Sequence, residues 1–477
     1  MIEKREFYVG GKWVKPVQGT DHFVIDAATE EPCAVISLGG KADIDRAVAA
    51  AARAFPAWSA TPRADRVGLL KTLLALMEKH LARTGAAISL EMGAPIDFAI
   101  ESQAACGPWH LKGFLKAIDE FQWEFQRNNK GEWIIREPVG VCGLITPWNW
   151  PSNQIALKVI PALATGCTVV LKPSEIAPLS ALDFAAMIDE AGFPAGVFNL
   201  VNGDGATAGA ALSAHPGVDM MSFTGSTRAG ILVSKSAADT IKRVTLELGG
   251  KSPNIVFADA DLPKAVARGV AHCFENTGQS CNAPTRMLVE KNVYEKAVGL
   301  AVEAGKATKV GNPRDKGGHI GPLASKAQFN KVQELIQAGI DEGARLVLGG
   351  PGRPEGFNRG WYARPTIFAD VDNSMRIARE EIFGPVLAMI PFSGEEEAIR
   401  VANDTPYGLA AYVQTGDPQR GKRVARALRA GMVRLNGAGL TAGHPFGGYK
   451  QSGNGREGGV WGLEDFLETK IVGGWQS

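Results

Sequence analysis

The chain has 477 residues, of which 45% are hydrophobic, and its 51 Lys and Arg against 50 Asp and Glu give a formal net charge of +1. Such a length predicts roughly two to four domains with real apolar cores, and the balanced charge argues against a nucleic-acid-binding protein, which would carry a basic surplus. The most apolar run, 155–171, contains Lys158, Pro161 and Gly166, so we expect no membrane span.

The N-terminus lacks the apolar core of a signal peptide, and the six cysteines lack a metal-like spacing. We therefore expect a cytoplasmic protein with reduced thiols and no metal site. The first predicted element is a hairpin over 7–14 that turns at Gly10 and Gly11. Helical segments follow after Asp43, from Thr61 as N-cap with Pro62 as the first helical residue, and over about 100–124.

From Gly140 the chain alternates short apolar runs with helical segments. The predicted strands are 141–146, 168–171, 197–201, 220–223 and 244–248, and the helices between them are 154–164, 182–191, 206–214 and 228–236. Strands separated by single helices form parallel βαβ units, so this part predicts an α/β, doubly wound parallel sheet that binds ligands at the carboxyl ends of its strands.

A second α/β series begins after Gly249 and Gly250. It comprises a strand over 254–257, a helix over 262–274, a polar loop through Cys281, a strand over 286–290 and a helix over 293–307. The tail, 466–473, is predicted as a strand with nothing after it to pair with, which suggests docking on another subunit.

Cys281 differs from the other five cysteines because it lies in a polar, turn-rich loop, ENTGQSCNAPTR. A thiolate is a strong nucleophile, and a loop cysteine can meet a substrate where a buried one cannot. On its own this is a weak signal, since most loop cysteines are not catalytic. Glu247, an acid at the end of an apolar strand, is either a general base or a structural carboxylate that holds the turn at Gly249 and Gly250.

Three further strand ends carry polar groups. Asn149 in ITPWNWP offers an amide that could stabilise an oxyanion. Glu175 follows the second strand, where dinucleotide folds bind the adenosine ribose, and its charge would repel a 2′-phosphate, so NAD is favoured over NADP. The turn FTGSTRAG, 223–230, suits phosphate at a helix N-terminus, although it is GxxxxG and lacks the usual dinucleotide fingerprint.

Together these segments resemble the aldehyde dehydrogenase superfamily. The matching motifs are ITPWNWP, KPSE, FTGST, LELGGKSP, GQSC, EEIFGPV (380–386) and PFGGYKQSGNGRE (445–457), in the family's order. The resemblance implies that Cys281 attacks an aldehyde, that Asn149 holds the resulting oxyanion, and that Glu247 activates the water that hydrolyses a thioester, with Lys158 as a proton relay. It also implies a Rossmann-like cofactor domain and reduction of NAD, with NADP less favoured.

The resemblance assigns further positions by motif. Those implied to bind the cofactor are Ile145, Thr146, Pro147, Trp148, Lys172, Ser174, Glu175, Gly205, Phe223, Thr224, Gly225, Ser226, Leu248, Glu381 and Phe383. Those implied to line the substrate tunnel are Trp150, Gln154, Leu157, Ser280, Asn282, Leu440 and Phe446. The sequence shows no convergent arginine pair for a carboxylate-bearing semialdehyde, and we expect an aromatic or medium-chain aldehyde.

The family also implies a subunit in three parts. We expect a cofactor-binding domain over 1–120 and 139–249, a catalytic domain over 250–448, an oligomerisation arm over 121–138 and 464–477, and a return segment over 449–463. The arm implies a homodimer or homotetramer, and neither nucleic acid nor a membrane is expected as a partner. A CoA-acylating or semialdehyde-specific member stays open as an alternative, and a non-catalytic binding protein would need a damaged Cys281, Asn149 or Glu247.

Overall fold

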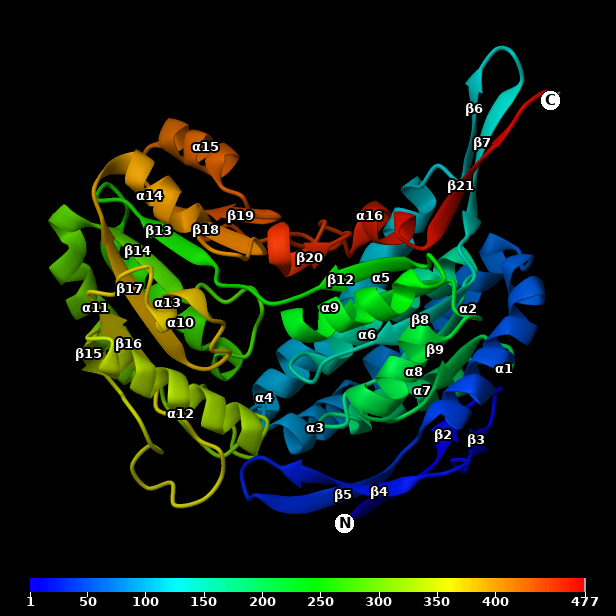
Figure 1. Cartoon of the computed structure of the whole chain (residues 1–477), viewed down its shortest axis with the longest axis horizontal. Coiled ribbons are helices and arrows are strands. Elements are labelled where there is room, and N and C mark those ends of the chain that lie inside the picture. Colours follow the sequence, from blue (N-terminus) through cyan, green and yellow to red (C-terminus); the bar gives the residue numbers. More distant parts are fainter. Residues whose placement is uncertain (476–477) are drawn as a thin grey trace.

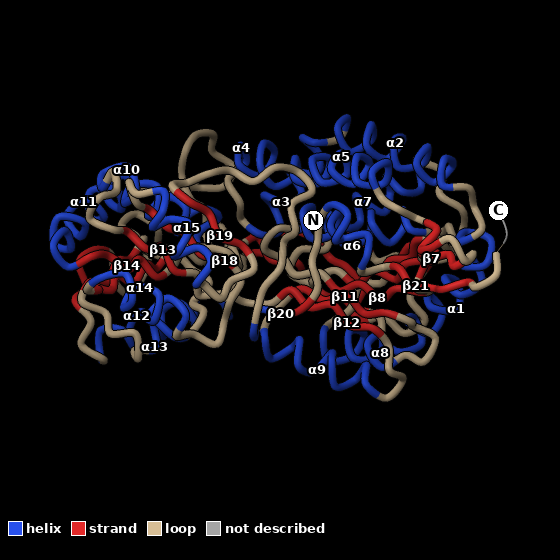
Figure 2. Tube along the Cα trace, turned by 90° about the horizontal axis from the view of Figure 1, so that it is seen from above, coloured by secondary structure: helices blue, strands red, loops and turns tan. Residues whose placement is uncertain are grey.

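The computed structural model describes residues 1–475. Two α/β halves lie side by side, and a narrow arm that carries the C-terminus projects from one of them (Figure 1). Each half is built on its own sheet, with helices on both faces of it (Figure 2). No helix within these residues is both long and apolar enough to cross a membrane.

The sheet of the first half has eight strands, and its centre is parallel, as predicted. In spatial order the strands are β20 (Gly453–Asn454), β12 (Arg243–Glu247), β11 (Met220–Thr224), β8 (Val141–Ile145), β9 (Thr168–Lys172), β10 (Phe198–Leu200), β2 (Phe7–Tyr8) and β3 (Trp13–Val14). Every residue of β8, β9 and β11 is buried, because helices cover both faces of these strands. This explains why they read as continuous apolar runs in the sequence.

Helices of the first half pack on this sheet. They are α1 (Lys41–Ser59), α2 (Arg63–Lys79), α3 (Leu81–Met92), α4 (Ile96–Phe98), the π-helix η1 (Ala99–Ala104), α5 (Ala105–Glu120), α6 (Pro151–Thr165), α7 (Leu179–Glu190), the π-helix η2 (Gly205–Gly209), α8 (Ala210–Ala214), α9 (Thr227–Ala238) and α16 (Gly459–Glu464). The largest core cluster lies between α2, α5, α6 and α7 and the strands beneath them, with Leu111, Phe114, Leu163 and Phe198 buried in it.

The second half has a seven-stranded sheet. Its strands are, in spatial order, β15 (Arg345–Leu348), β16 (Thr366–Ala369), β17 (Val386–Phe392), β14 (Arg286–Glu290), β13 (Pro253–Val256), β18 (Ala410–Gln414) and β19 (Met432–Leu435). Its helices are α10 (Leu262–Phe274), η3 (Glu275–Gly278), η4 (Lys291–Val293), α11 (Tyr294–Ala307), α12 (Lys326–Asp341), α13 (Arg376–Arg379), α14 (Gly394–Asn403), α15 (Pro418–Ala427) and η5 (Lys450–Ser452). Buried side chains on both faces of the sheet form two further cores.

The prediction that the tail strand has no partner is wrong. Strand β21 (Leu467–Val472) pairs antiparallel with β7 (Glu132–Pro138) of the same chain, and β7 pairs in turn with β6 (Glu124–Asn128). The sequence could not reveal this pairing because β7 lies more than half the chain away. In this three-stranded sheet β21 is an edge strand, so one of its two sides is free for a further strand.

Two predicted helix boundaries also need correction. The segment predicted over 100–124 begins as a π-helix and ends at Glu120, and Glu124 already belongs to β6. Pro108 inside it has no N–H for the carbonyl of Ala104, which instead accepts a hydrogen bond from the Ser152 hydroxyl at 3.2 Å. The helix predicted from Pro62 begins at Arg63, with Pro62 rather than Thr61 as the N-cap. A sheet of β1 (Ile2–Lys4), β5 (Glu31–Leu38) and β4 (Thr20–Asp26) was not predicted.

Candidate active site

Cys281 lies just after a strained turn that connects α10 to β14. Asn276, Thr277 and Gly278 all have left-handed backbone angles, with φ of 52°, 58° and 72°, which non-glycine residues rarely adopt. Packing holds them there: the Thr277 hydroxyl donates to the carbonyl of Gly321 at 3.1 Å, and a Cβ on Gly278 would overlap the carbonyl of Gly384. The turn therefore fixes the loop that carries Cys281.

The same turn positions Asn149, at the end of the segment that follows β8. The Asn276 amide donates to the Asn149 carbonyl at 2.9 Å, and the Asn149 amide donates to the Gln279 carbonyl at 3.0 Å. The Gln103 amide in turn donates to Asn276 Oδ1 at 2.8 Å. A primary amide has two hydrogens, so one fixes the orientation of the buried Asn149 side chain and the other is free to stabilise an oxyanion.

Two adjacent glycines bring the two halves of the molecule together at this point. The backbone N–H of Gly250 donates to Glu381 Oε1 at 2.9 Å. A Cβ on Gly249 would overlap the Glu381 carboxylate, and one on Gly250 would overlap the carbonyl oxygen of Cys281. The Glu381 carboxylate and the Cys281 backbone can therefore lie where they do only because positions 249 and 250 have no Cβ.

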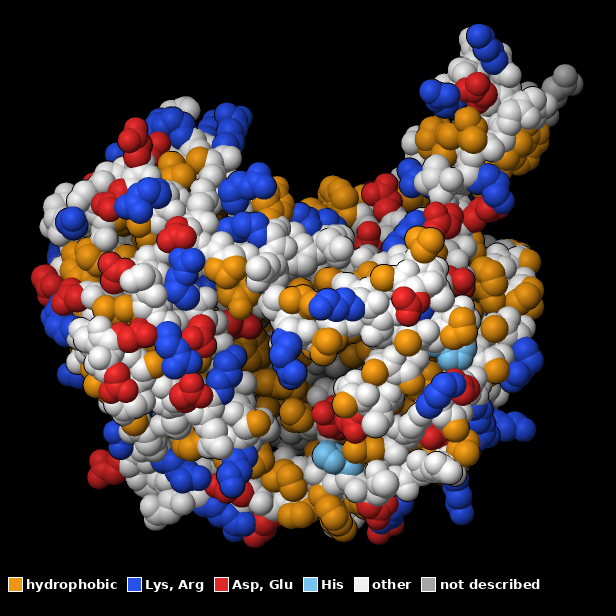
Figure 3. Space-filling view, viewed as in Figure 1, with side chains coloured by type: hydrophobic (Ala, Val, Ile, Leu, Met, Phe, Trp, Pro, Cys, Tyr) orange, Lys and Arg blue, Asp and Glu red, His pale blue; other side chains and the backbone are white. Residues whose placement is uncertain are grey.

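These groups surround one cleft of about 650 Å³. It is lined by Pro147, Trp148, Asn149, Thr224, Gly225, Ser226, Leu248, Gly249, Cys281, Gln328, Lys331, Glu381 and Phe383. The cleft has walls from both halves, and Figure 3 shows the surface hollowed between them, with hydrophobic side chains in the hollow. The structure thus brings two predicted catalytic residues together with eight residues predicted to bind the cofactor.

Glu247 lies at the carboxyl end of β12 and is buried. Neither of its carboxyl oxygens has a hydrogen-bond partner within residues 1–475. Burial, and then the nearby Glu457, raise the pKa of Glu247 well above its usual value, although Lys158 opposes the shift. Lys158 Nζ donates to Glu457 Oε1 at 2.6 Å and to the Ser222 hydroxyl at 3.0 Å. Glu247 therefore lies beside a buried ion pair that the sequence did not predict.

Cys281 is a partly exposed residue, as are Cys33 and Cys106, whereas Cys142, Cys167 and Cys273 are buried. Burial raises the pKa of Cys281 above its ordinary value, and the carboxylates of Glu381 and Glu247 raise it further. A thiol in this environment is protonated at neutral pH, so its reaction as a nucleophile requires a proton acceptor.

The residues predicted to bind a dinucleotide form a second group along the strand ends of the first half. Ser226 caps α9, with its hydroxyl accepting from the Ala229 N–H at 3.3 Å, and the first N–H groups of this helix suit a phosphate. The Thr224 hydroxyl, on the cleft wall, is buried with no partner within the described chain, as expected of a group awaiting a ligand. Ile145, Thr146 and Phe223 are buried beside these residues.

Lys172 and Glu175 lie close together beyond β9. Lys172 Nζ donates to the carbonyl of Gly203 at 2.6 Å and to Glu175 Oε2 at 3.4 Å, and burial lowers the pKa of Lys172. The Ser174 hydroxyl accepts a hydrogen bond from the Ile176 N–H at 3.2 Å. Gly205, two residues after Gly203, is the first residue of η2. The partly exposed Glu175 carboxylate is available to a ribose hydroxyl.

The seven predicted substrate residues lie on several elements, and none of them is among the residues that line this cleft. Trp150 Nε1 donates to the Ser280 hydroxyl at 2.9 Å, and its ring packs edge-on against Phe98. Phe446 packs with Cys281 against a small apolar cluster that includes Tyr412. Gln154 and Leu157 are buried on α6, Asn282 is partly exposed, and Leu440 is exposed on the small-residue segment 437–443.

Gln328 and Lys331 of α12 line the cleft but were not predicted. The Gln328 amide donates to the carbonyls of Ile382 and Phe383 at 2.9 and 2.8 Å. Burial raises the pKa of Glu381, and the charge of Lys331 opposes this rise. Their spacing of three residues places them on one helix face, but only tertiary packing brings that face to the cleft.

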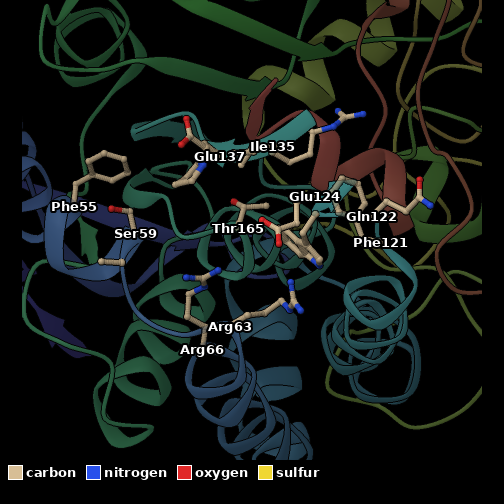
Figure 4. A pocket seen from close by; sticks show the side chains of 14 residues that line it. Phe55, Ser59, Arg63, Arg66, Phe121, Gln122, Glu124, Ile135, Glu137 and Thr165 are labelled. Carbon is tan, nitrogen blue, oxygen red and sulfur yellow. The ribbon is translucent and has the colours of Figure 1, made fainter. Parts of the chain in front are cut away.

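A larger cavity lies far from Cys281, at the base of the arm (Figure 4). It is open to solvent and, with its mouth included, takes in about 1710 Å³. Its lining includes Arg63, Arg66, Phe121, Trp123 and Arg136. Arg63 and Arg136 stack on Trp123 and Phe121, and Arg66 donates to the backbone carbonyls of Ala164 and Thr61. It contains no predicted catalytic residue, so its size does not make it the active site.

Comparison with known proteins gives consistent matches over nearly the whole chain. The model of the aldehyde dehydrogenase family matches residues 13–472. A 3-succinoylsemialdehyde-pyridine dehydrogenase of a Pseudomonas species is 53% identical over 478 residues, which cover 100% of both chains.

Among solved structures, an aldehyde dehydrogenase from Bartonella henselae superimposes with a TM-score of 0.98 at 55% identity, covering 99% of this chain and 100% of that one. A variant of aldehyde dehydrogenase C from Pseudomonas syringae, solved with NAD+ and octanal, also has a TM-score of 0.98, at 50% identity, covering 99% and 97% of the two chains.

Proposed function

The chain belongs to the aldehyde dehydrogenase family, and on this basis we propose that it oxidises an aldehyde to the carboxylic acid through a covalent intermediate on Cys281. The observation that carries the proposal is the single cleft in which Cys281 and the Asn149 amide lie beside Thr224, Ser226, Leu248 and Glu381. A nucleophile and an oxyanion donor are thereby placed next to the positions expected to hold a dinucleotide.

The first chemical step is attack of the Cys281 sulfur on the aldehyde carbon, with transfer of the thiol proton to the Glu247 carboxylate. The negative oxygen that forms accepts a hydrogen bond from the free N–H of the Asn149 amide and from the Cys281 backbone N–H. When bound, NAD+ supplies the acceptor for the hydride that leaves this carbon. A thioester on Cys281 remains.

Glu247 then takes a proton from water, and the resulting hydroxide attacks the thioester carbon. The C–S bond breaks, and the acid that forms gives its proton to the departing Cys281 sulfur and leaves as the carboxylate, so Cys281 recovers its thiol. Lys158, held by Glu457 at 2.6 Å, lies beside the base and provides a route for its proton to leave. The buried, unpaired carboxyl group of Glu247 favours this role over a purely structural one, because a structural carboxylate would be hydrogen-bonded.

The cofactor is NAD in this proposal. Ser226 and the start of α9 would hold the pyrophosphate, Lys172 and Glu175 the adenosine ribose, and Glu381 with the Leu248 carbonyl the nicotinamide ribose and ring. The orphaned Thr224 hydroxyl supports the fit. The Glu175 carboxylate would repel a 2′-phosphate, so NADP is disfavoured, and the NAD+ bound to the Pseudomonas syringae relative agrees with this preference.

The substrate that we propose is an aromatic or medium-chain aldehyde. Trp150 and Phe98 on one side and Phe446 near Cys281 on the other supply apolar and aromatic surface. The names of two relatives support the class, since one acts on a pyridine semialdehyde and the other was solved with octanal. Acyl transfer to CoA is the alternative, and the presence of Glu247 argues for hydrolysis.

The three-part division of the subunit stays part of the proposal, with β6, β7 and β21 as the oligomerisation arm. Strand β21 is an edge strand, Ile471 on it is 58% exposed, and Trp475 beyond it is 44% exposed. Exposed apolar side chains on a free strand edge favour pairing with a second copy of the chain. Light scattering of wild type and Ile471→Lys tests this, with a smaller species expected for the variant.

The function is tested by NADH formation at 340 nm with octanal and with an aromatic aldehyde, each with NAD+ and NADP+. Cys281→Ala should abolish turnover, and Cys142→Ala, a buried thiol, is the matched control. Glu247→Gln should give one rapid equivalent of NADH and then stall. Full activity of Cys281→Ala, or acyl-CoA in place of free acid when CoA is added, would overturn the mechanism.

A further inference from the structure

A second polar pocket lies against the loop that carries Cys281. It is open to solvent and, with its mouth included, takes in about 790 Å³ between α10, β18, β19 and the segment after β19. Its lining includes Arg268, His272, Glu275, Tyr412 and Arg434. Neither the proposed chemistry nor the proposed cofactor site uses any of these residues.

Two arginines line this pocket, although the sequence alone showed no convergent arginine pair. Arg268 comes from α10 and Arg434 from β19, so the sequence keeps them far apart. Arg434 Nε donates to the carbonyl of Ala438 at 2.7 Å, and Arg268 Nη2 donates to Gln414 Oε1 at 2.5 Å. Gly437 lies so close that a Cβ on it would overlap the Arg268 guanidinium. One turn of backbone thus holds both groups in place.

Both arginines retain unused donors. Within residues 1–475 neither forms an ion pair with a carboxylate, whereas most surface arginines of this chain do. An arginine has five N–H donors in a planar fork, and each of these two spends only one on the bonds above. The remaining donors suit the paired oxygens of a carboxylate.

The other groups of the pocket set the charge of the ligand. Glu275 is the one acid among its lining residues, and burial raises the pKa of that carboxyl while Arg434 opposes the shift. Burial and Arg434 lower the pKa of His272 to about 4, so this imidazole is neutral at pH 7. Two arginines against one carboxylate leave a net charge of +1, which one carboxylate group of a ligand would neutralise.

A ring contact and a hydrogen bond connect the pocket to the loop that carries Cys281. Tyr412 stacks edge-on against His272, with ring centroids 5.1 Å apart, and its hydroxyl donates to the carbonyl of Asn282 at 2.9 Å. Asn282 follows Cys281 directly, and Glu275 precedes the strained turn at Asn276. A ligand between Arg268 and Arg434 would therefore contact the residues that support the catalytic loop from behind.

We propose that Arg268 and Arg434 form a binding site for a carboxylate-bearing small molecule beside the Cys281 loop. The carboxylate comes either from the far end of an aldehyde substrate or from a separate acid, such as the product of the reaction. Binding itself does not depend on the proposed aldehyde oxidation, and the comparison of the two sources does.

Isothermal titration calorimetry with glutarate, at an ionic strength matched with KCl, tests the site on the full chain. We expect saturable binding to wild type, at least tenfold weaker binding to Arg434→Gln and Arg268→Gln, and an intermediate loss for Arg434→Lys, which keeps the charge and loses the fork. Arg426→Gln, an exposed arginine of α15, is the matched control and should bind as wild type does. Thermal melting identifies any variant that fails to fold, in which case Arg434→Lys carries the test.

Octanal oxidation in the presence of glutarate then separates the two sources. A raised KM for octanal with unchanged kcat indicates a site within reach of the substrate's far end, and a changed kcat with unchanged KM indicates a separate effector; either result supports the site. Absence of saturable binding, equal binding by Arg434→Gln, or equal loss in Arg426→Gln would overturn it. Failure of octanal oxidation in the absence of glutarate contradicts the proposed function alone.

Discussion

Gly250 offers the sharpest test of the active-site geometry, because a single methyl group there should displace the nucleophile. A Cβ at this position would overlap the carbonyl oxygen of Cys281. Carbon and oxygen atoms that are not bonded keep about 3.3 Å apart, so the Cys281 backbone would have to move by roughly 1 Å in Gly250→Ala. The strained turn at Asn276 and Gly278 leaves this loop little freedom to absorb the shift elsewhere.

Misplacement of a reacting group by about 1 Å can cost roughly 10²-fold in rate, and overpacking of a buried site costs about 1–3 kcal/mol. We therefore expect Gly250→Ala to lower kcat for octanal about 10²-fold in a protein that still folds. Steady-state NADH formation gives kcat, and thermal melting gives the stability. Gly249→Ala should differ, because its Cβ meets the Glu381 carboxylate and should mainly raise KM for NAD+.

Gly299→Ala is the matched control, since a Cβ at this position of α11 meets nothing within 4 Å. It should keep full activity and gain slightly in stability, because alanine is the better helix former. Wild-type kcat in Gly250→Ala would refute the reasoning, as it would show that the carbonyl of Cys281 is not held against this glycine during turnover.

Three other predictions follow from single side chains. Arg286 is fully buried and donates hydrogen bonds to Lys251, Asn373, Val401 and Ala402. Arg286→Met should therefore lower the free energy of unfolding, measured by urea titration, by at least about 3 kcal/mol. An unchanged urea midpoint would contradict this. Lys331→Gln should raise KM for NAD+ about fivefold with little change in kcat, whereas Lys326→Gln on the exposed start of α12 should not. Burial raises the pKa of Glu91 to about 7, so between about pH 4.5 and 7 the folded state holds a proton that the unfolded state has lost. Wild type should therefore lose thermal stability relative to Glu91→Gln as the pH rises through this range. Equal changes in the melting temperatures of the two proteins would contradict this.

The sequence predicted the elements that are buried on both sides. The strands at 168–171 and 286–290 and the helix over 262–274 agree with the structure to within a residue, because continuous apolar runs between helical segments leave few alternatives. The strands Thr20–Asp26 and Glu31–Leu38 were missed because they mix charged with apolar residues and lie partly exposed. Their pairing is a tertiary choice that local pattern does not encode.

The candidate active site shows the same difference between residues that local sequence pattern predicts and residues that tertiary packing places. Asn149 and Ser226 follow the buried parallel strands β8 and β11, and Glu247 ends the neighbouring parallel strand β12. Strand ends of one sheet meet at one edge, so the sequence could group these residues. Lys331 and Arg434 come from α12 and β19 of the second half, which only tertiary packing brings near Cys281, and no spacing in the chain relates them to it. The sequence therefore predicted the residues of one sheet edge and, through Cys281 and the motif of Glu381 and Phe383, part of the opposite wall, but not the residues of α12.

The electrostatics of the cleft imply an order for the two proton transfers. The charges of Cys281 and Glu247 repel each other, and burial disfavours both, so only one of the two ionises readily. Once Cys281 carries an acyl group it can no longer form a thiolate, so the ionisation of Glu247 no longer competes with that of Cys281. The pH profile of the NADH burst should therefore rise at a higher pH than that of thioester hydrolysis, measured by stopped flow with octanal. Coincident profiles, or a hydrolysis profile displaced to higher pH, would show that the two charges do not interact during the reaction.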